Sequence, residues 1–213
     1  MEISEHIKEF GMILENGIAV LSIIGEIEGH MCLSADSKTT KYEHILPLLC
    51  GMDMAEEISG VLFLINTVGG DISCGLAIAE MIAGMKKPTV AFVIGDSHSI
   101  GLPITVAAKK TFIAKTATIV VHPVRMSGMV IGAKQTMDQF EAMQERIAGF
   151  VEAHTDCSAV KFSRMMMSHN MSAKDLGTLL VGEEAVKAGL IQRTGSINDA
   201  FCALQEDIKY VEH

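Results

Sequence analysis

The sequence predicts a single α/β domain with a largely parallel central sheet. Three short apolar runs rich in β-branched residues, at 17–27, 61–66 and 89–95, are typical of buried strands. The second and third runs are each followed by a glycine-containing turn and a segment of helical character. Because parallel strands are joined by crossover connections that are usually helical, this alternation indicates an α/β architecture. With 213 residues and 49% apolar content, we expect one domain over 1–213.

The first half of the chain begins with polar residues. Residues 1–16 look irregular, and the strand at 17–27 is expected to start the sheet. A surface loop is expected at 28–42, and the stretch after it looks helical. The strand at 61–66 leads into a helix with apolar residues at helical spacing, which ends before Pro88.

The second half contains the longest predicted helix. A second helix follows the strand at 89–95, and short strands are expected at 111–114 and 118–121. Residues 132–155 place apolar side chains along one stripe of a helix that looks too long to serve only as a crossover. After a polar, methionine-rich stretch, residues 182–191 indicate a short helix and then a final short strand.

Charge and hydropathy argue against nucleic-acid binding and against a membrane-spanning helix. The formal charge is −9, and Lys and Arg are scattered, so nucleic-acid binding is disfavoured. No stretch reaches the ~18 apolar residues that a membrane-spanning helix needs. The first ten residues have neither a basic start nor an apolar run, so we expect no signal peptide and a cytoplasmic protein.

The cysteines suggest neither a disulfide framework nor a metal site. There are five of them, an odd number, and they show no CxxC or histidine-interleaved spacing. We therefore expect them to be small buried hydrophobic residues, namely Cys32, Cys50, Cys74, Cys157 and Cys202.

Ser99 is the candidate nucleophile. It lies in the segment GDSHSIG (95–101), where a predicted strand turns sharply into a helix. At such a turn the serine hydroxyl projects from the end of the sheet, and the amide of Ile100 points to the same place. As a bare pattern, this serine is more often only a helix cap.

A second strand-to-helix turn, NTVGGD (66–71), is the candidate oxyanion loop. Two consecutive glycines let the backbone bend tightly and leave amide groups free to donate. The amide of Gly69 or its neighbour is then a candidate donor. Taken alone, an ordinary turn is the more frequent explanation.

His122 is the candidate general base, because it directly follows a short apolar strand and precedes Pro123. An unperturbed histidine, with a pKa near ~6.5, accepts a proton at neutral pH. His98 is a rival, but consecutive side chains point in different directions, so we prefer His122 to His98 as the partner of Ser99. A histidine base usually has an aspartate partner. Asp175 is a candidate for this role, and the alternative is that it is only a solvated loop residue.

Taken together and in this order, these segments resemble the proteolytic subunit of the Clp protease, a family of self-compartmentalising serine peptidases. The likeness runs from about Val61 to Ile191. Residues 64–70 are similar to the oxyanion loop of that family, 95–101 to its nucleophile turn and 120–123 to its histidine strand. A closer resemblance, over nearly the whole chain, is to the subgroup called translocation-enhancing protein, through the stretches 27–30, 38–44, 66–71, 98–101 and 122–125.

The resemblance implies a role for each candidate residue. It makes Ser99 the nucleophile, His122 the base, and the amides of Gly69 and Ile100 the oxyanion hole. The position of the family's aspartate falls on a glycine, Gly177. Asp175, two residues earlier, is assigned to the triad on the expectation that the loop follows a different path.

The family fold is a stack of strand-strand-helix units, shared with enoyl-CoA hydratases (the crotonase-like fold), whose protruding long helix interlocks opposed rings. The resemblance therefore implies a homo-oligomer, a heptameric ring or double ring joined through the helix at 132–155. It also implies cleavage of peptides or unfolded proteins, with neither cofactor nor metal. The N-terminal region is unlike the usual Clp subunit, so dependence on an ATPase partner stays open.

Three other functions remain as alternatives. An enoyl-CoA hydratase or isomerase uses the same two-amide hole on a thioester, although those enzymes generally rely on carboxylates. A Ser-Lys signal-peptide peptidase requires Lys109, Lys110 or Lys134 to reach Ser99. A non-catalytic Clp-like scaffold or adaptor is compatible with an incomplete triad.

Overall fold

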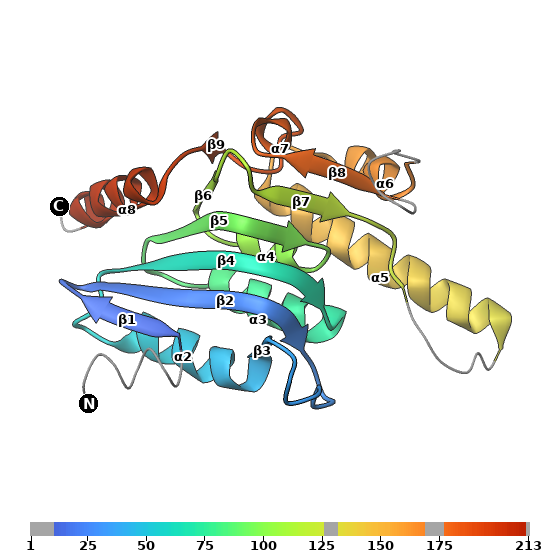
Figure 1. The fold of residues 1–213 in the computed structure, drawn as a ribbon, viewed down its shortest axis with the longest axis horizontal. Coiled ribbons are helices and arrows are strands. Elements are labelled where there is room, and N and C mark those ends of the chain that lie inside the picture. Colours follow the sequence, from blue (N-terminus) through green and yellow to red (C-terminus); the bar gives the residue numbers. More distant parts are fainter. Residues whose placement is uncertain (1–10, 126–131, 169–176, 212–213) are drawn as a thin grey trace.

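The computed structural model describes residues 11–125, 132–168 and 177–211 (Figure 1). A nine-stranded sheet forms its centre, with α2, α3 and α4 against one face and α8 against the other. The strands are β1 (Met12–Glu15), β2 (Ile18–Glu28), β3 (Thr39–Lys41), β4 (Gly60–Gly70), β5 (Thr89–His98), β6 (Lys110–Ile113), β7 (Thr118–Val121), β8 (Thr178–Val181) and β9 (Arg193–Thr194). The helices are α2 (Tyr42–Met54), α3 (Ile72–Ala83), α4 (Gly101–Val106), α5 (Ala133–His154), α6 (Ala159–Met166), α7 (Glu183–Lys187) and α8 (Ile197–Val211).

The sheet is parallel along its main path, as the sequence predicted. β2, β4, β5, β6 and β9 are neighbours in that order and pair in parallel. β1 pairs antiparallel with β2 at one edge, and β8 pairs antiparallel with β7. The α/β fold class is therefore confirmed, and the antiparallel strands add to the predicted sheet.

β4 and β5 extend beyond the ends predicted for them. The register shifts after Ile65, and pairing resumes between Thr67 and Ser97. β5 also gains a second neighbour there, because residues 96–98 pair with β7. The two extensions carry the glycine loop and the nucleophile turn to the same edge of the sheet.

Two hydrophobic clusters hold these layers together. The larger cluster fills the space between the sheet and α2–α5, with fully buried residues such as Phe63, Ile78 and Leu102. The smaller one lies on the opposite face, where α8 packs Ala200, Ala203 and Leu204 against β4–β6. Among the described helices, none combines the length and apolar character needed to cross a bilayer.

Several elements differ from the prediction. β1 lies in a segment expected to be irregular, and β3 lies in the expected loop at 28–42. α6 lies in the polar, methionine-rich stretch, and β8 and α8 were not predicted. Apart from α8, which has 15 residues and a buried apolar side, these elements are short or polar, and pairing or packing with distant residues stabilises them where local propensity is weak.

The expectation that all cysteines are buried is wrong for three of them. Cys74 and Cys157 are buried, whereas Cys32, Cys50 and Cys202 are exposed. On α2 the buried stripe is Ile45, Leu49 and Met52. Cys50 follows Leu49 directly, so the helical period turns its side chain away from that stripe.

Candidate active site

Ser99 lies in a left-handed turn between β5 and α4. Its φ of +54° is uncommon for any residue except glycine. The N–H of Ser99 donates to the carbonyl of Val120 at 2.8 Å, which fastens the turn to β7. The capping position of α4 belongs to Ile100, so Ser99 is not the cap of this helix. Backbone strain of this kind is typical of functional positions and supports the nucleophile interpretation.

The glycine loop packs directly against this turn. Gly69 has a φ of +93°, and a Cβ on it would lie 2.8 Å from Cβ of Ser99 and 3.4 Å from the nitrogen of Ile100. Only glycine permits such an approach. Among the described residues, the amide of Ile100 has no hydrogen-bond acceptor. It is therefore available as one oxyanion donor.

Gly70 is better placed than Gly69 to give the second donor. The N–H of Gly69 already donates to the hydroxyl of Thr67 at 3.1 Å, and Gly69 is buried. The N–H of Asp71 donates to the carbonyl of Ile27 on β2 at 3.0 Å. Because successive amides of a strand point to opposite sides, the N–H of Gly70 faces the β5 side, where Ser99 lies. Gly70 is also exposed to the cavity that Ser99 lines.

His122 has one ring nitrogen fixed by its own backbone neighbour. Nδ1 lies 2.7 Å from the carbonyl oxygen of Pro123. Since a carbonyl can only accept a hydrogen bond, Nδ1 carries the proton in the neutral ring, and the lone pair is on Nε2. This is the tautomer that a general base acting through Nε2 requires.

Ser99 and His122 line the same cavity, which has a volume of about 260 Å³. Within the described part of the chain, no hydrogen bond joins the two side chains. The cavity brings together the end of β4, the start of α3, the segment after β7, and α5 and α6. Most of its lining is apolar, with Arg125 and His122 as its charged or titratable members; the apolar side chains are Val68, Ile72, Val121, Val124, Ile147, Phe162 and Met166.

The position that the family resemblance gives to the catalytic aspartate is occupied by Gly177, which has no side chain. Gly177 packs against the histidine strand, and a Cβ there would lie 2.6 Å from the carbonyl oxygen of Val121 and 3.1 Å from Cβ of His122. Its φ of +137° also favours glycine. Asp175 lies outside the described residues, so its assignment to the triad stays a prediction.

The rival histidine, His98, is bonded away from the nucleophile. Its Nε2 lies 2.7 Å from the hydroxyl of Thr118, and it does not line the cavity of Ser99. Burial lowers the pKa of His98, Asp96 raises it, and a positive charge on His122 lowers it further. The preference for His122 over His98 is consistent with this arrangement.

Two of the three lysines considered for a Ser-Lys dyad, Lys109 and Lys110, make other contacts. Nζ of Lys109 donates to the carbonyls of Lys86 and Lys87 at 2.7 and 2.8 Å. Nζ of Lys110 lies 2.6 Å from Oδ1 of Asp207 on α8. Neither amine is directed at Ser99, which weighs against that mechanism.

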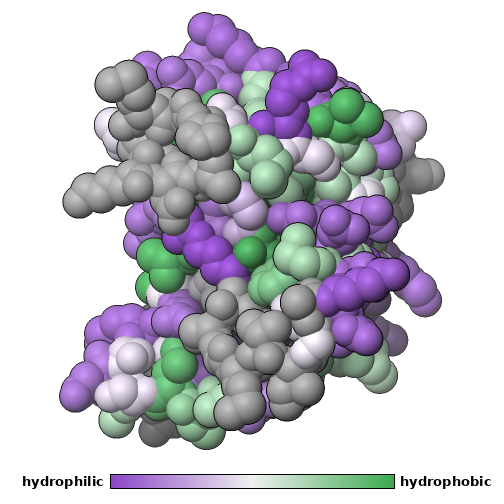
Figure 2. Space-filling model, turned by 90° about the vertical axis from the view of Figure 1, so that its right-hand side faces the viewer, coloured by the Kyte–Doolittle hydropathy of each residue, from purple (hydrophilic) through white to green (hydrophobic). Residues whose placement is uncertain are grey.

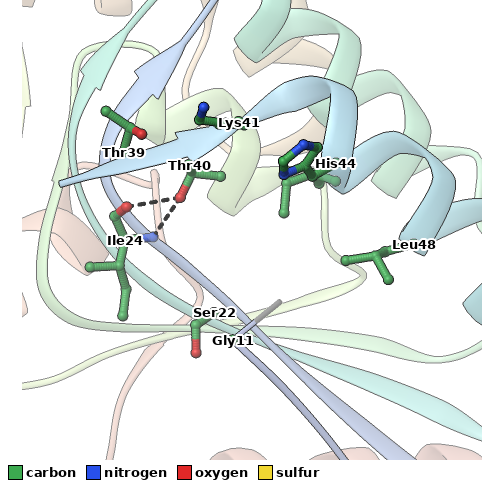
Figure 3. A pocket seen from close by; sticks show the side chains of 9 residues that line it. Gly11, Ser22, Ile24, Thr39, Thr40, Lys41, His44 and Leu48 are labelled. Carbon is green, nitrogen blue, oxygen red and sulfur yellow. Dashed lines mark hydrogen bonds between the residues drawn. The ribbon is translucent and has the colours of Figure 1, made fainter. Parts of the chain in front are cut away.

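A second cavity, of about 420 Å³, also contains a serine and a histidine (Figure 3). It lies between β2 and the segment from β3 to α2, and the hydroxyl of Thr40 donates to the carbonyl of Ile24 and accepts from its N–H. The hydroxyl of Ser22 points away from His44 (Figure 3), and no hydrogen bond connects them among the described residues. In the described residues neither cavity has a hydrogen bond between its serine and its histidine, so this feature does not distinguish the two.

The surface at the right-hand end of Figure 1 is mixed in character. In Figure 2 its hydrophilic residues predominate, and apolar residues form small separate groups between them. The face shows no continuous apolar area in its described part. The distribution of apolar residues on this face therefore does not by itself indicate a partner.

Known proteins resemble this chain over most of its length. Residues 16–197 match the family model described as Clp protease. The chain is 48% identical over 195 residues to the translocation-enhancing protein TepA of Halalkalibacterium halodurans, covering 92% of this chain and 76% of that protein. It is 24% identical over 152 residues to the ATP-dependent Clp protease proteolytic subunit 1 of Protochlamydia amoebophila, covering 70% and 71%.

A third relative is matched over a shorter stretch. The ATP-dependent Clp protease proteolytic subunit of Leuconostoc citreum is 30% identical over 119 residues, which is 55% of this chain and 54% of that protein. The family model spans both the glycine loop and the segment that contains Ser99 and His122. On the extent of that match and on the identity to TepA, this chain belongs to the Clp protease family.

Proposed function

We propose that the chain is a serine endopeptidase that hydrolyses peptides or unfolded proteins through an acyl-enzyme on Ser99. The observation that carries the proposal is the turn at Ser99. There a left-handed serine stands beside a glycine loop and beside the amide of Ile100, for which the described residues give no acceptor, in a cavity shared with His122. Membership of the Clp protease family supports the same chemistry.

The proposed reaction assigns one task to each group. The hydroxyl of Ser99 attacks the peptide carbonyl while Nε2 of His122 takes its proton. The amides of Ile100 and Gly70 donate to the oxygen that becomes negatively charged. His122 then protonates the leaving amine, and water repeats the sequence to release the acid. In free enzymes the nucleophile and base are often too far apart to bond and approach when substrate binds.

The cavity indicates which side chains the substrate presents. Its apolar walls, from α3, α5 and α6, favour an apolar side chain next to the scissile bond. An extended chain beside the glycine loop would bind as an added strand. Both features favour unfolded substrates over folded ones.

We also propose that the chain assembles as a ring-forming homo-oligomer. The C-terminal half of α5 is buried through Ile147, Phe150 and Val151, whereas its N-terminal half extends away from the domain (Figure 1). Met137 in that half is 57% exposed. Apolar residues on a protruding helix are typical of an interface with another copy. A monomer in sedimentation at micromolar concentration would contradict this.

Labelling with a fluorophosphonate probe tests the proposed nucleophile. We expect the wild-type protein and Ser22→Ala to be labelled, and Ser99→Ala to lose labelling entirely. Ser22 is the matched control because it is the serine of the second cavity. Labelling that survives Ser99→Ala would remove Ser99 as nucleophile. An assembled wild-type protein that never labels would favour a non-catalytic scaffold, in agreement with the glycine at 177.

A further inference from the structure

A row of polar side chains runs along one face of β5 and β7 toward His122. The parallel register pairs Asp96 with Thr118 and His98 with Val120. Alternate residues of a strand share a face, so His98 lies on the face of Asp96. By the same rule His122, which directly follows β7, lies on the face of Thr118.

Hydrogen bonds connect three members of this row. The hydroxyl of Thr118 donates to Oδ1 of Asp96 at 2.7 Å. Since Thr118 has only that proton to give, its oxygen accepts from Nε2–H of His98, which lies at 2.7 Å. Nε2 of His98 is also 3.3 Å from Oδ1 of Asp96. A neutral His98 in this arrangement has its lone pair on Nδ1, which can then accept a hydrogen bond.

The surroundings of His98 favour its neutral form. Its side chain is 22% exposed, and burial is the main cause that lowers its pKa. The titratable groups that act on it are Asp96, from β5, and His122, after β7. β8, which packs on the other edge of β7, presents the apolar residues Leu179 and Val181 opposite Val120 and Thr118. A charge on His98 and a charge on His122 therefore oppose each other.

We propose that His98 is a positioning residue for His122, and that the Asp96–Thr118–His98 chain stabilises the positive charge that His122 acquires during the reaction. This role rests on the proposed function, whereas the coupling between the two histidines rests on the β5–β7 register, which places His98 beside Val120, and on the effect of a charge on His122 at His98. The family's aspartate position is Gly177, which has no carboxylate to give. The chain places the carboxylate of Asp96 two hydrogen bonds from a ring that neighbours His122.

The pH dependence of fluorophosphonate labelling tests the catalytic role. Asp96→Asn, Thr118→Val and His98→Gln each change a different member of the chain: the first removes its negative charge, the second its hydroxyl and the third its imidazole ring. We expect each to slow labelling about tenfold and to move the acid limb of the rate profile to lower pH, because the base is weaker without this support. Thr118→Ser retains the hydroxyl and should keep the wild-type profile. Asp36→Asn removes one exposed surface carboxylate and controls for net charge.

Because the three residues act as one unit, their effects should not add. The double variant Asp96→Asn with His98→Gln is expected to label no more slowly than the slower single variant. A merely structural role would lower the rate and leave the acid limb in place. Wild-type rates in all three single variants, or losses that multiply in the double variant, would overturn the proposal.

Carbethoxylation with diethyl pyrocarbonate tests the coupling without any need for activity. Trypsin separates the two histidines into peptides 87–109 and 116–125, each with one histidine. We expect the reactivity of His98 to rise at lower pH in Asp96→Asn than in wild type or Asp36→Asn. In His122→Gln it should rise at higher pH than in wild type, because the positive charge that opposes a charge on His98 has been removed.

The two variants therefore move the His98 curve in opposite directions. The carboxylate of Asp96 raises the pKa of His98, so losing it moves the curve to lower pH. The charge on His122 lowers the pKa of His98, so His122→Gln moves the curve to higher pH. Asp36→Asn should move it in neither direction.

The two experiments separate failure of the inference from failure of the proposed function. If the wild-type protein does not label but its His98 curve shifts as expected in the variants, the proposed function is wrong and the coupling between the two histidines stands. If the wild-type protein labels but its His98 curve responds to neither Asp96→Asn nor His122→Gln, the proposed function stands and the inference about His98 is wrong.

Discussion

The cavities at Ser99 and at Ser22 contain similar residue types on different backbones. Each has a serine and a histidine in its lining. Ser22 lies within the regular strand β2, and its N–H donates to the carbonyl of Gly11 at 3.0 Å. Ser99 lies in a left-handed turn, next to an amide that has no acceptor among the described residues. The difference between the two sites is therefore in the main chain.

That difference shows why a serine and a histidine in one cavity are not enough for catalysis. In β2 the ladder uses the amides beside Ser22, so none is free to stabilise a developing negative charge. At Ser99 the turn interrupts the ladder and leaves such an amide beside the hydroxyl. Substitutions at matched positions of the two cavities test this contrast.

The largest expected effect is loss of the base. His122→Gln should lower the rate of fluorophosphonate labelling by about 10²–10⁴, the usual range for removal of a general base. His44→Gln, in the second cavity, should label at the wild-type rate. Labelling kinetics at pH 7 measure both variants. Equal rates for His122→Gln and His44→Gln would contradict the assignment of the base.

A smaller effect is expected from crowding the nucleophile turn. A Cβ at Gly75, on α3, would lie 2.4 Å from Cγ1 of Ile100. Gly75→Ala should therefore displace Ile100 with its amide, lower the labelling rate about tenfold and cost about 1–3 kcal/mol through overpacking. Thermal unfolding and labelling kinetics measure the two effects.

Gly51 gives the matched control for this helix substitution. It lies in α2, near the second cavity, and a Cβ there would have nothing within 4 Å. Gly51→Ala should stabilise the helix by up to about 1 kcal/mol and leave labelling unchanged. If Gly75→Ala behaves like Gly51→Ala, the packing of α3 on Ile100 does not position the amide.

The smallest expected effect is on the pH dependence of stability. Burial lowers the pKa of His98 in the folded chain. A histidine with a depressed pKa favours the fold while it is neutral, so its contribution is complete above about pH 6.5 and is lost as the pH falls through the lower folded value. His98→Gln should therefore lose less stability than wild type between pH 7 and 5. Ser22→Ala, which removes no titratable group, should keep the wild-type slope in thermal unfolding.

The elements that the sequence predicted well are the ones with strong local patterns. β2, β4 and β5 are apolar, β-branched runs, and α3 and α5 have apolar residues at helical spacing. β1 and β8 have four residues each and depend on partners elsewhere in the chain. Short strands of this kind have no local signal strong enough to separate them from loops.

The candidate site was predicted in its side chains and less well in its backbone. Ser99 and His122 meet in one cavity, as the sequence suggested. Our preference for Gly70 over Gly69 as proposed oxyanion donor depends on which amides the β2–β4 ladder and Thr67 already use, and no sequence pattern shows this. Phe162 and Met166 line the cavity from α6, a helix that the polar sequence around it concealed.

The left-handed backbone of Ser99 also limits which nucleophiles this position can accept. A β-branched side chain is strongly disfavoured at a φ of +54°, so threonine cannot replace serine there without distorting the turn. Cysteine has the same unbranched Cβ as serine and fits the same backbone. This backbone can therefore accept a thiol nucleophile, in Ser99→Cys, whereas it cannot accept the secondary alcohol of threonine.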